Sequence, residues 1–198
     1  EEIASFVSMA VIVPTLIGAA IAVQLCKKYD KFKIFYFSYM FALILGIVRY
    51  IAGYENMMVY VILNALGGFP LGIAAILQYQ FTPDCYEYGQ YKTGLKMRGV
   101  TFAAQTFFTK LNGAIATAVS VFALTLIGFK EGEGVIQAAG FADKLWTFSC
   151  LGSIIGGIGT LLILRLYKLN DHDVQLMSKC NNGEITREEA EAQMINRY

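Results

Sequence analysis

The sequence has 198 residues, of which 56% are hydrophobic and 16% charged, and its formal net charge is +1 at pH 7. A soluble domain of this size could not hide so much apolar surface, so the composition excludes an ordinary soluble protein and indicates an integral membrane protein. The near-neutral charge gives no indication of a nucleic-acid partner.

Five apolar stretches are long enough to cross a bilayer as helices. Each reaches or approaches the roughly 20 residues that a helix needs to span the hydrocarbon core. We therefore predict an all-α membrane protein with about five transmembrane helices. The predicted spans are 3–25, 34–52, 57–81, 100–128 and 145–166.

The first two spans are joined by a short basic segment. Arg49 lies one turn before the end of the second span, where its head can reach the headgroups while its stem stays in the hydrocarbon. We interpret Arg49 as an anchor at the membrane interface, and a gating contact is the alternative. The turn at 53–56 is so short that the second and third spans must be neighbours.

The third span is interrupted in its middle by three glycines and a proline: Gly67, Gly68, Pro70 and Gly72. A proline inside a helix removes a backbone donor and bends the helix. Interrupted spans are typical of transporter binding sites, and a simple kink explains the same pattern equally well.

One face of the third span is polar at both ends. At helical spacing Asn64 and Gln78 fall on the same side, so this face could border water. We therefore include Asn64 and Gln78 among the candidate substrate-binding residues.

The segment 83–99 is predicted to be a loop that is dense in charge. Its acidic residues come first and its basic residues last: Asp84, Glu87, Lys92, Lys96 and Arg98. This order allows an ion-pair latch between the two ends of the loop. A solvated loop with alternating charges is the alternative.

Lys110 lies in the middle of the fourth span, roughly 15 Å from its end at the helical rise of about 1.5 Å per residue. A cation at that depth costs about 2.5–3.5 kcal/mol, so a helix usually carries one only where it meets a wet cavity or a counter-charge. Small and hydroxylated residues share its face within roughly 80° of arc: Thr106, Gly113, Thr117 and Ser120. We interpret this face as the lining of a cavity, and packing against a neighbouring helix is the alternative.

The fifth span and the residues after it carry weaker signals. Gly152-x-x-x-Gly156 is a motif of close helix packing. Trp146, near the start of the span, is most simply an interface anchor, with sugar stacking as the alternative. In the polar tail, Thr186 with Glu189 fits a capping box and predicts a short helix over 188–195.

No phosphate-binding loop, nucleophilic triad or metal-ligand spacing is present in the sequence. We therefore expect no enzyme, no catalytic residue and no metal site. The four cysteines show no paired spacing and are predicted to be free thiols.

Basic residues gather after the first, third and fifth spans. By the positive-inside rule these segments are cytoplasmic, so the N-terminus is expected outside and the C-terminus inside. We divide the chain into a transmembrane bundle, 1–168, and a cytoplasmic tail, 169–198. An odd number of spans and an outside start suggest that upstream spans are missing, because transporter repeats are built in multiples of three helices.

The segment after the third span resembles a known transporter family. It reads Asp84-Cys-Tyr-Glu87-Tyr88-Gly89-Gln-Tyr91-Lys92-Thr93-Gly94, followed by Gly99, the pair Gln105-Thr106 and Lys110. This pattern is similar to the glycoside–pentoside–hexuronide:cation symporters of the major facilitator superfamily, which include melibiose permease. The resemblance covers 3–167 and makes the chain similar to the last five spans of a twelve-span fold.

The resemblance implies a protein of the bacterial inner membrane that carries a sugar together with a coupling cation, Na⁺ or H⁺. It implies that Lys110, Gln105 and Thr106 line the central sugar cavity. It also implies a cytoplasmic gate built from one segment: Asp84, Glu87, Tyr88, Lys92, Lys96 and Arg98. The acids that bind the coupling cation belong to the N-terminal half of such transporters, so that missing half is an expected partner, with the sugar and membrane lipid.

Arg98 departs from the family pattern. The family commonly reads T-G-x-R-x-E-G, whereas this chain reads Thr93-Gly94-Leu-Lys96-Met-Arg98-Gly99. A gate pair that used the missing carboxylate is therefore reversed or lost.

The sequence thus favours part of a secondary active transporter that moves a glycoside, pentoside or hexuronide by cation-coupled symport and alternating access. No bound cofactor is expected. Two alternatives stay open: a transporter of the same fold for a lipid or another solute, and a non-transporting membrane fragment or scaffold.

Overall fold

The structure is a computed structural model that describes residues 2–132 and 136–196. Within those ranges every regular element is a helix. Five helices are long and apolar enough to cross a membrane, which confirms the predicted all-α membrane fold. The helices are α1 (Glu2–Leu25), α2 (Lys31–Ala52), α3 (Met57–Thr93), α4 (Arg98–Leu126), α5 (Phe141–Leu164), α6 (Asp171–Asn181) and α7 (Arg187–Gln193).

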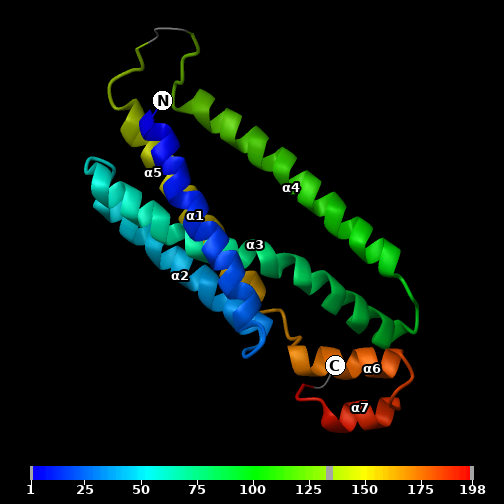
Figure 1. Cartoon of the computed structure of the whole chain (residues 1–198). Helices are drawn as coiled ribbons and strands as arrows, with labels where there is room; N and C mark the ends of the chain where they lie inside the picture. The colour runs from blue at the N-terminus through cyan, green and yellow to red at the C-terminus, as the bar shows by residue number, and fades with distance from the viewer. Residues whose placement is uncertain (1, 133–135, 197–198) are drawn as a thin grey trace.

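The packed part of the bundle is built around α3, as Figure 1 shows. Both α1 and α2 pack along α3, and α5 packs on α2. The short helices α6 and α7 lie across one end of the bundle, which we call the tail end. We call the opposite end, where α2 turns into α3 and α5 begins, the far end.

α3 is longer than the sequence predicted. It continues through Pro83 to Thr93 and ends where Gly94 adopts a left-handed backbone with φ of 72°. The loop predicted over 83–99 is therefore wrong for most of its length, and only 94–97 connects α3 to α4.

The tail explains why the polar turns of α3 between Pro83 and Thr93 stay helical. α6 packs against α3, and Asp84, Gln90 and Tyr91 are buried there. A hydropathy pattern cannot reveal this, because the partner that covers the polar turns lies about a hundred residues further along the chain.

The glycines in the middle of α3 serve helix packing. A Cβ atom added at Gly68 would lie 2.7 Å from the carbonyl oxygen of Val11, and one added at Gly72 would overlap the carbonyl of Thr15. Gly18 of α1 meets the backbone of α3 in the same way. The glycines therefore let α1 and α3 approach backbone to backbone, while α3 stays one continuous helix.

The predicted packing motif on α5 is not used in the same way. A Cβ atom built at Gly152 or Gly156 meets nothing within 4 Å among the described residues, whereas one at Gly157 would lie 3.2 Å from Cδ1 of Leu43 on α2. The glycine of α5 that faces α2 is therefore Gly157, one residue after the second glycine of the predicted motif.

The tail is folded rather than merely polar. The capping box at the start of α7 is confirmed, because the Thr186 hydroxyl accepts from the backbone N–H of Glu189 and the Glu189 carboxylate accepts from the N–H of Thr186. α6 is an additional helix that the sequence did not predict.

α4 stands apart from the other helices, as Figure 1 shows. Its contacts are chiefly with α3, from which it continues. Within the described part of the chain, Ala123 is the one residue of α4 that is buried. The face that carries Lys110 therefore has no covering helix here.

Candidate functional site

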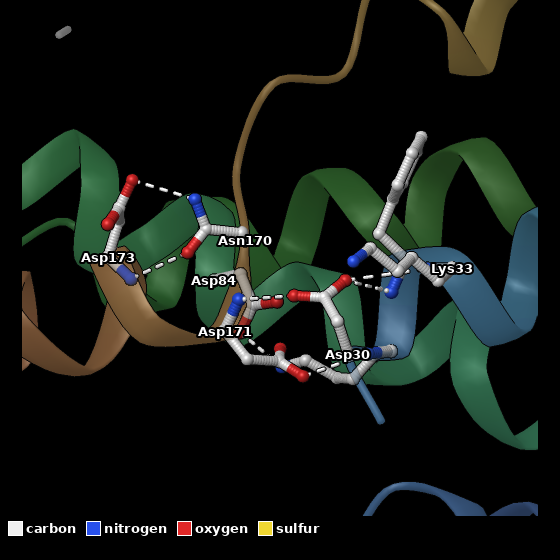
Figure 2. Close-up of polar contacts among 8 residues, drawn as sticks. Asp30, Lys33, Asp84, Asn170, Asp171 and Asp173 are labelled. Atoms are coloured by element: carbon white, nitrogen blue, oxygen red, sulfur yellow. Dashed lines mark hydrogen bonds and ion pairs between the residues drawn. The ribbon is translucent and has the colours of Figure 1, made fainter. Parts of the chain in front are cut away.

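At the tail end, one ammonium joins carboxylates from two other helices. Nζ of Lys31 lies 2.7 Å from Oδ1 of Asp84 and 3.2 Å from Oδ1 of Asp171. Asp84 is only 5% exposed, and a carboxylate so deeply buried needs an opposite charge or hydrogen bonds. Figure 2 shows Asp30, Asp84 and Asp171 gathered where α2, α3 and α6 meet. We call these three aspartates and Lys31 the tail clasp.

The clasp also joins the first turns of α2 and α6 reciprocally. Oδ2 of Asp171 accepts from the backbone N–H of Lys31 at 2.8 Å. Oδ2 of Asp30 accepts from the N–H of Asp171 at 2.9 Å, while its Oδ1 accepts from the N–H of Phe32. Each helix therefore supplies a carboxylate that caps the other, and a negative charge is favourable at a helix N-terminus.

A second carboxylate of the tail gathers the end of the described chain. Asp173 accepts hydrogen bonds from the backbone N–H groups of Ile195 and Asn196, at 2.8 and 3.0 Å, and from Nδ2 of Asn170 at 2.7 Å. Burial alone would raise the pKa of Asp173, but these hydrogen bonds outweigh it and hold the pKa below its ordinary value. Asp173 therefore stays ionised at neutral pH and fixes the segment after α7.

The polar turns of α3 contact the tail at two further points. Nδ2 of Asn181 donates to the Glu87 carboxylate at 2.8 Å. The hydroxyl of Tyr91 donates to the Glu191 carboxylate at 3.0 Å, and the Arg187 guanidinium lies 4.8 Å from the centre of the Tyr91 ring. The last three turns of α3 and the tail thus form one polar interface.

The predicted gate residues fall into two groups. Asp84 and Glu87 are engaged at the tail interface, and Tyr88 is half-buried on the same turns of α3. Lys92, Lys96 and Arg98 are exposed. Among the described residues no ion pair joins the two groups, so the expected latch between them is replaced by the pairing of Asp84 with Lys31.

The predicted substrate-binding residues of α4 lie on its open side. Lys110 and Thr106 are exposed and Gln105 is half-buried. The hydroxyl of Thr106 donates to its own helix at the Phe102 carbonyl, 3.0 Å away. In the described ranges no carboxylate lies within ion-pair distance of Lys110. Its charge therefore has no partner on this part of the chain.

Asn64 and Gln78 on α3 lie apart from each other. Gln78 is exposed. The Asn64 amide oxygen accepts from Nη1 of Arg49 at 3.2 Å, and its Nδ2 donates to the Tyr60 carbonyl at 2.7 Å. Arg49 is thus engaged with a neighbouring helix.

Sequence reasoning missed several residues of the tail clasp and the polar interface, among them Lys31, Asp171 and Asn181. A usable signal existed for two of them. Asp30-Lys31 and Asn170-Asp171 each place a capping residue just before a helix, a pattern that predicts a helix start. Nothing in the sequence shows that the two helix starts face each other.

The side chains of the tail clasp are suited to forming and breaking ion pairs reversibly. The tail clasp consists of side chains that can exchange charged partners without breaking a covalent bond. The face of α4 that carries Lys110, Thr106, Thr117 and Ser120, which we call the α4 stripe, offers one cation and three hydroxyls beside the amide of Gln105. Such groups bind polar solutes.

Comparison with known proteins agrees with this chemistry. A family described as MFS/sugar transport protein matches residues 2–171. The chain is 25% identical over 185 residues to a putative sulfoquinovose importer of Escherichia coli, which covers 89% of this chain and 38% of that protein. It is 22% identical over 165 residues to a putative glycoside/cation symporter of Escherichia coli, with 83% and 36% covered.

A third relative is a putative 2,3-dihydroxypropane-1-sulfonate exporter of Salmonella typhimurium, 26% identical over 113 residues, with 57% of this chain and 24% of that protein covered. The chain therefore spans at most 38% of the length of these three relatives. No solved structure matches the chain.

Proposed function

The chain belongs to the MFS/sugar transport protein family, and on that premise we propose that it is the C-terminal part of a cation-coupled sugar symporter. The solute would bind between this part and an N-terminal half, near the middle of the membrane, and cross by alternating access. The relatives named above are described as transporters, including a glycoside/cation symporter, which supports this choice over an enzyme.

The observation that carries the proposal is the uncovered stripe around Lys110. An ammonium in the middle of a membrane-spanning helix is costly unless water, a solute or a counter-charge reaches it. Among the described residues no helix covers the stripe and no acid pairs with Lys110. Lys110 therefore would face the cavity between the two halves, with Gln105 and Thr106 hydrogen-bonding the sugar.

The same ammonium would favour a sugar that carries an acid group. Two of the three relatives are named for sulfonated solutes. A hexuronate or a sulfonated sugar would place its anion at Lys110, where a charge-assisted hydrogen bond is stronger than one to a neutral hydroxyl.

At the tail end, the clasp would act in closing the cavity. Asp84 and Glu87 hold the last turns of α3 against the tail, while the exposed Lys92, Lys96 and Arg98 would meet acids of the other half. Opening would then require these turns to move relative to that half, with Tyr88 at the boundary.

The expected setting is the bacterial inner membrane, with the tail in the cytoplasm and the N-terminal end of α1 outside. The coupling cation, Na⁺ or H⁺, would bind in the N-terminal half, since the stripe on α4 presents a cation and not a carboxylate. Membrane lipid would surround the exposed flanks of the helices.

The test is uptake by the complete transporter in proteoliposomes under a Na⁺ or H⁺ gradient. Radiolabelled sulfoquinovose, glucuronate and melibiose would be compared with a labelled lysolipid, which tests the alternative cargo. We expect the acidic sugars to accumulate best and Lys110→Ala to lower their uptake about tenfold or more, the factor that a charge-assisted hydrogen bond contributes.

The matched control is Lys144→Ala, because Lys144 is an exposed lysine at the start of α5, away from the stripe. It should transport normally. Unchanged sugar uptake in Lys110→Ala would refute the central role of Lys110, and lysolipid flux without sugar flux would replace the sugar by a lipid.

A further inference from the structure

A cavity of about 420 Å³ opens between α2, α3 and α5 at the far end of the bundle. Two residues on its wall, Met57 and Leu145, are 47% and 39% exposed, so the cavity communicates with the surroundings. It lies well away from the Lys110 stripe, which is on α4. The lining residues that matter below are Arg49, Tyr54, Met57, Leu145, Trp146 and Ser149.

Arg49 gives the cavity a charge that the protein does not neutralise. Its guanidinium lies 5.6 Å from the centre of the Trp146 ring, and Nη1 donates to Asn64 at 3.2 Å. No carboxylate of the described residues lies within ion-pair distance of it. A guanidinium has five N–H donors, so a single amide partner leaves most of its capacity for a ligand.

Asp143, which follows the lining residue Ala142, is already engaged by a neighbour. The Tyr54 hydroxyl donates to Oδ1 of Asp143 at 2.5 Å, and this bond contributes first to raising the pKa of Tyr54 above its ordinary value. Meanwhile Nε of Arg49 and Nε1 of Trp146 are buried with no hydrogen-bond partner in the described part of the chain. Buried donors are normally satisfied, so this corner lacks an acceptor.

We propose that this cavity binds an oxyanion of the phosphate type, and that the occupant is the phosphate of a phospholipid headgroup. Arg49 lies three residues before the end of α2, about 4.5 Å along the helix axis, which places it at headgroup depth. The planar guanidinium fork matches phosphate oxygens. Tryptophan and tyrosine favour the same layer of the membrane, and Met57 and Leu145 offer an apolar wall for the start of an acyl chain.

The proposal is independent of the transport function. It concerns the outer flank of the bundle, and it stands whether the complete protein moves sugars, lipids or nothing. Its ligand would steady the junction of α2, α3 and α5, where the Tyr54–Asp143 bond already joins the α2–α3 turn to the start of α5.

The experiment uses the complete protein in nanodiscs and reads the fluorescence of Trp146, the one tryptophan of this sequence. Spectra of Trp146→Phe are subtracted, so that only the Trp146 signal remains. Brominated phosphatidylglycerol and brominated phosphatidylcholine are added separately at equal mole fraction. We expect an apparent preference for the anionic lipid of about fivefold, the factor that one arginine near an anionic surface supplies.

Arg49→Gln should remove that preference, while Arg165→Gln, an exposed arginine just after α5 at the opposite end, should keep it. Ser149→Asp is a second test that leaves Arg49 in place, because a carboxylate introduced on the wall should repel the phosphate and also abolish the preference. It decides the question if Arg49→Gln does not fold.

Inorganic phosphate, titrated into nanodiscs of phosphatidylcholine, tests the other source of the same chemistry. A saturable change in Trp146 emission that Arg49→Gln or Ser149→Asp removes, without any lipid preference, would retain the oxyanion site and overturn the lipid as its occupant. Equal quenching by both lipids in the wild type, together with no response to phosphate, would overturn the site.

Discussion

α3 and α4 are both long, apolar helices that carry polar residues, but α3 is packed against several helices and α4 is mostly uncovered. α3 is held along its length by α1, α2 and α6, and its buried polar groups have partners, such as Asp84 with Lys31. α4 touches chiefly α3, and its hydroxyls return to their own helix, as at Thr117 and Ser120. Lys110 has no acid partner among the described residues.

The comparison separates two reasons for polar residues in a membrane helix. On α3 they fasten this part of the chain to itself, so changing them should alter stability. On α4 they have no partner from another helix among the described residues, and under the proposed function changing them should alter transport and leave the fold almost unchanged. The following experiments break or sharpen that distinction.

The largest effect is expected for Gly72→Leu on α3. The new side chain would meet the carbonyl of Thr15, a backbone group that cannot move aside, and overpacking of this kind costs about 3 kcal/mol or more. Thermal unfolding of the detergent-solubilised protein, followed by circular dichroism, measures the loss. Gly156→Leu on α5, where a Cβ atom meets nothing within 4 Å, is the control and should unfold at or slightly above the wild-type temperature, because leucine favours a helix more than glycine does. Equal unfolding temperatures for the two variants would contradict the close approach of α1 and α3.

Asp84→Asn should come next. It leaves the Lys31 ammonium with only Asp171, and we expect a loss of about 2 kcal/mol, less than for a fully buried pair because Lys31 keeps some contact with water. Hydrogen–deuterium exchange should become faster in α6 and unchanged in α4. Glu184→Gln, an exposed acid of the tail outside the clasp, is the control. Wild-type exchange in α6 would show that the clasp does not hold the tail.

The hydrogen bonds to Asp173 predict a smaller effect that depends on pH. Because its pKa is lowered in the folded protein, Asp173 contributes stability that is fully present above its ordinary pKa of about 3.9 and is lost as the pH falls toward the lower folded value. Exchange of the Ile195 and Asn196 amides should therefore be constant between neutral pH and about pH 5, after correction for intrinsic rates, and rise below about pH 4. Asp173→Asn should remove this dependence, and an unchanged profile in that variant would assign the effect to another group.

The smallest change is expected for Gly113→Ala on α4. Nothing lies near a Cβ atom at this position, so alanine should stabilise the helix by about 0.5–1 kcal/mol through its better propensity. Thermal unfolding of the complete transporter measures it. Destabilisation would show that another helix packs on this face of α4 in the complete protein, and would turn the open stripe into an interface.

The sequence was sufficient for features that depend on local chemistry. Five apolar stretches predicted five long helices, with most ends within a few residues, and the Thr186–Glu189 capping box predicted the start of α7. The end of α3 was missed by twelve residues, because the predicted span stops at Phe81 and the helix at Thr93. A charged segment is predicted to be a loop unless a partner that buries it is known, and here that partner is α6.

The candidate site also has one part that local sequence predicts and one part that depends on contacts between distant residues. Lys110 and its stripe follow from helical spacing, and their role stays a prediction because no surface of the described residues faces them. The pairing of Asp84 with Lys31 and Asp171 could not be read from spacing, since the three come from separate helices. The glycines around Gly68 illustrate the reverse case, in which a pattern was visible and its cause, contact with α1, was not.

The reciprocal bonds between Asp30 and Asp171 connect positions 141 residues apart. During synthesis the first of them leaves the ribosome long before the second exists, so the Lys31–Asp84 pair and the last turns of α3 stay open to water until α6 arrives. Docking of α6 thus covers the polar end of α3 last. A polypeptide that stops short of α6 would keep the Lys31–Asp84 pair but would leave Gln90 and Tyr91 open to water.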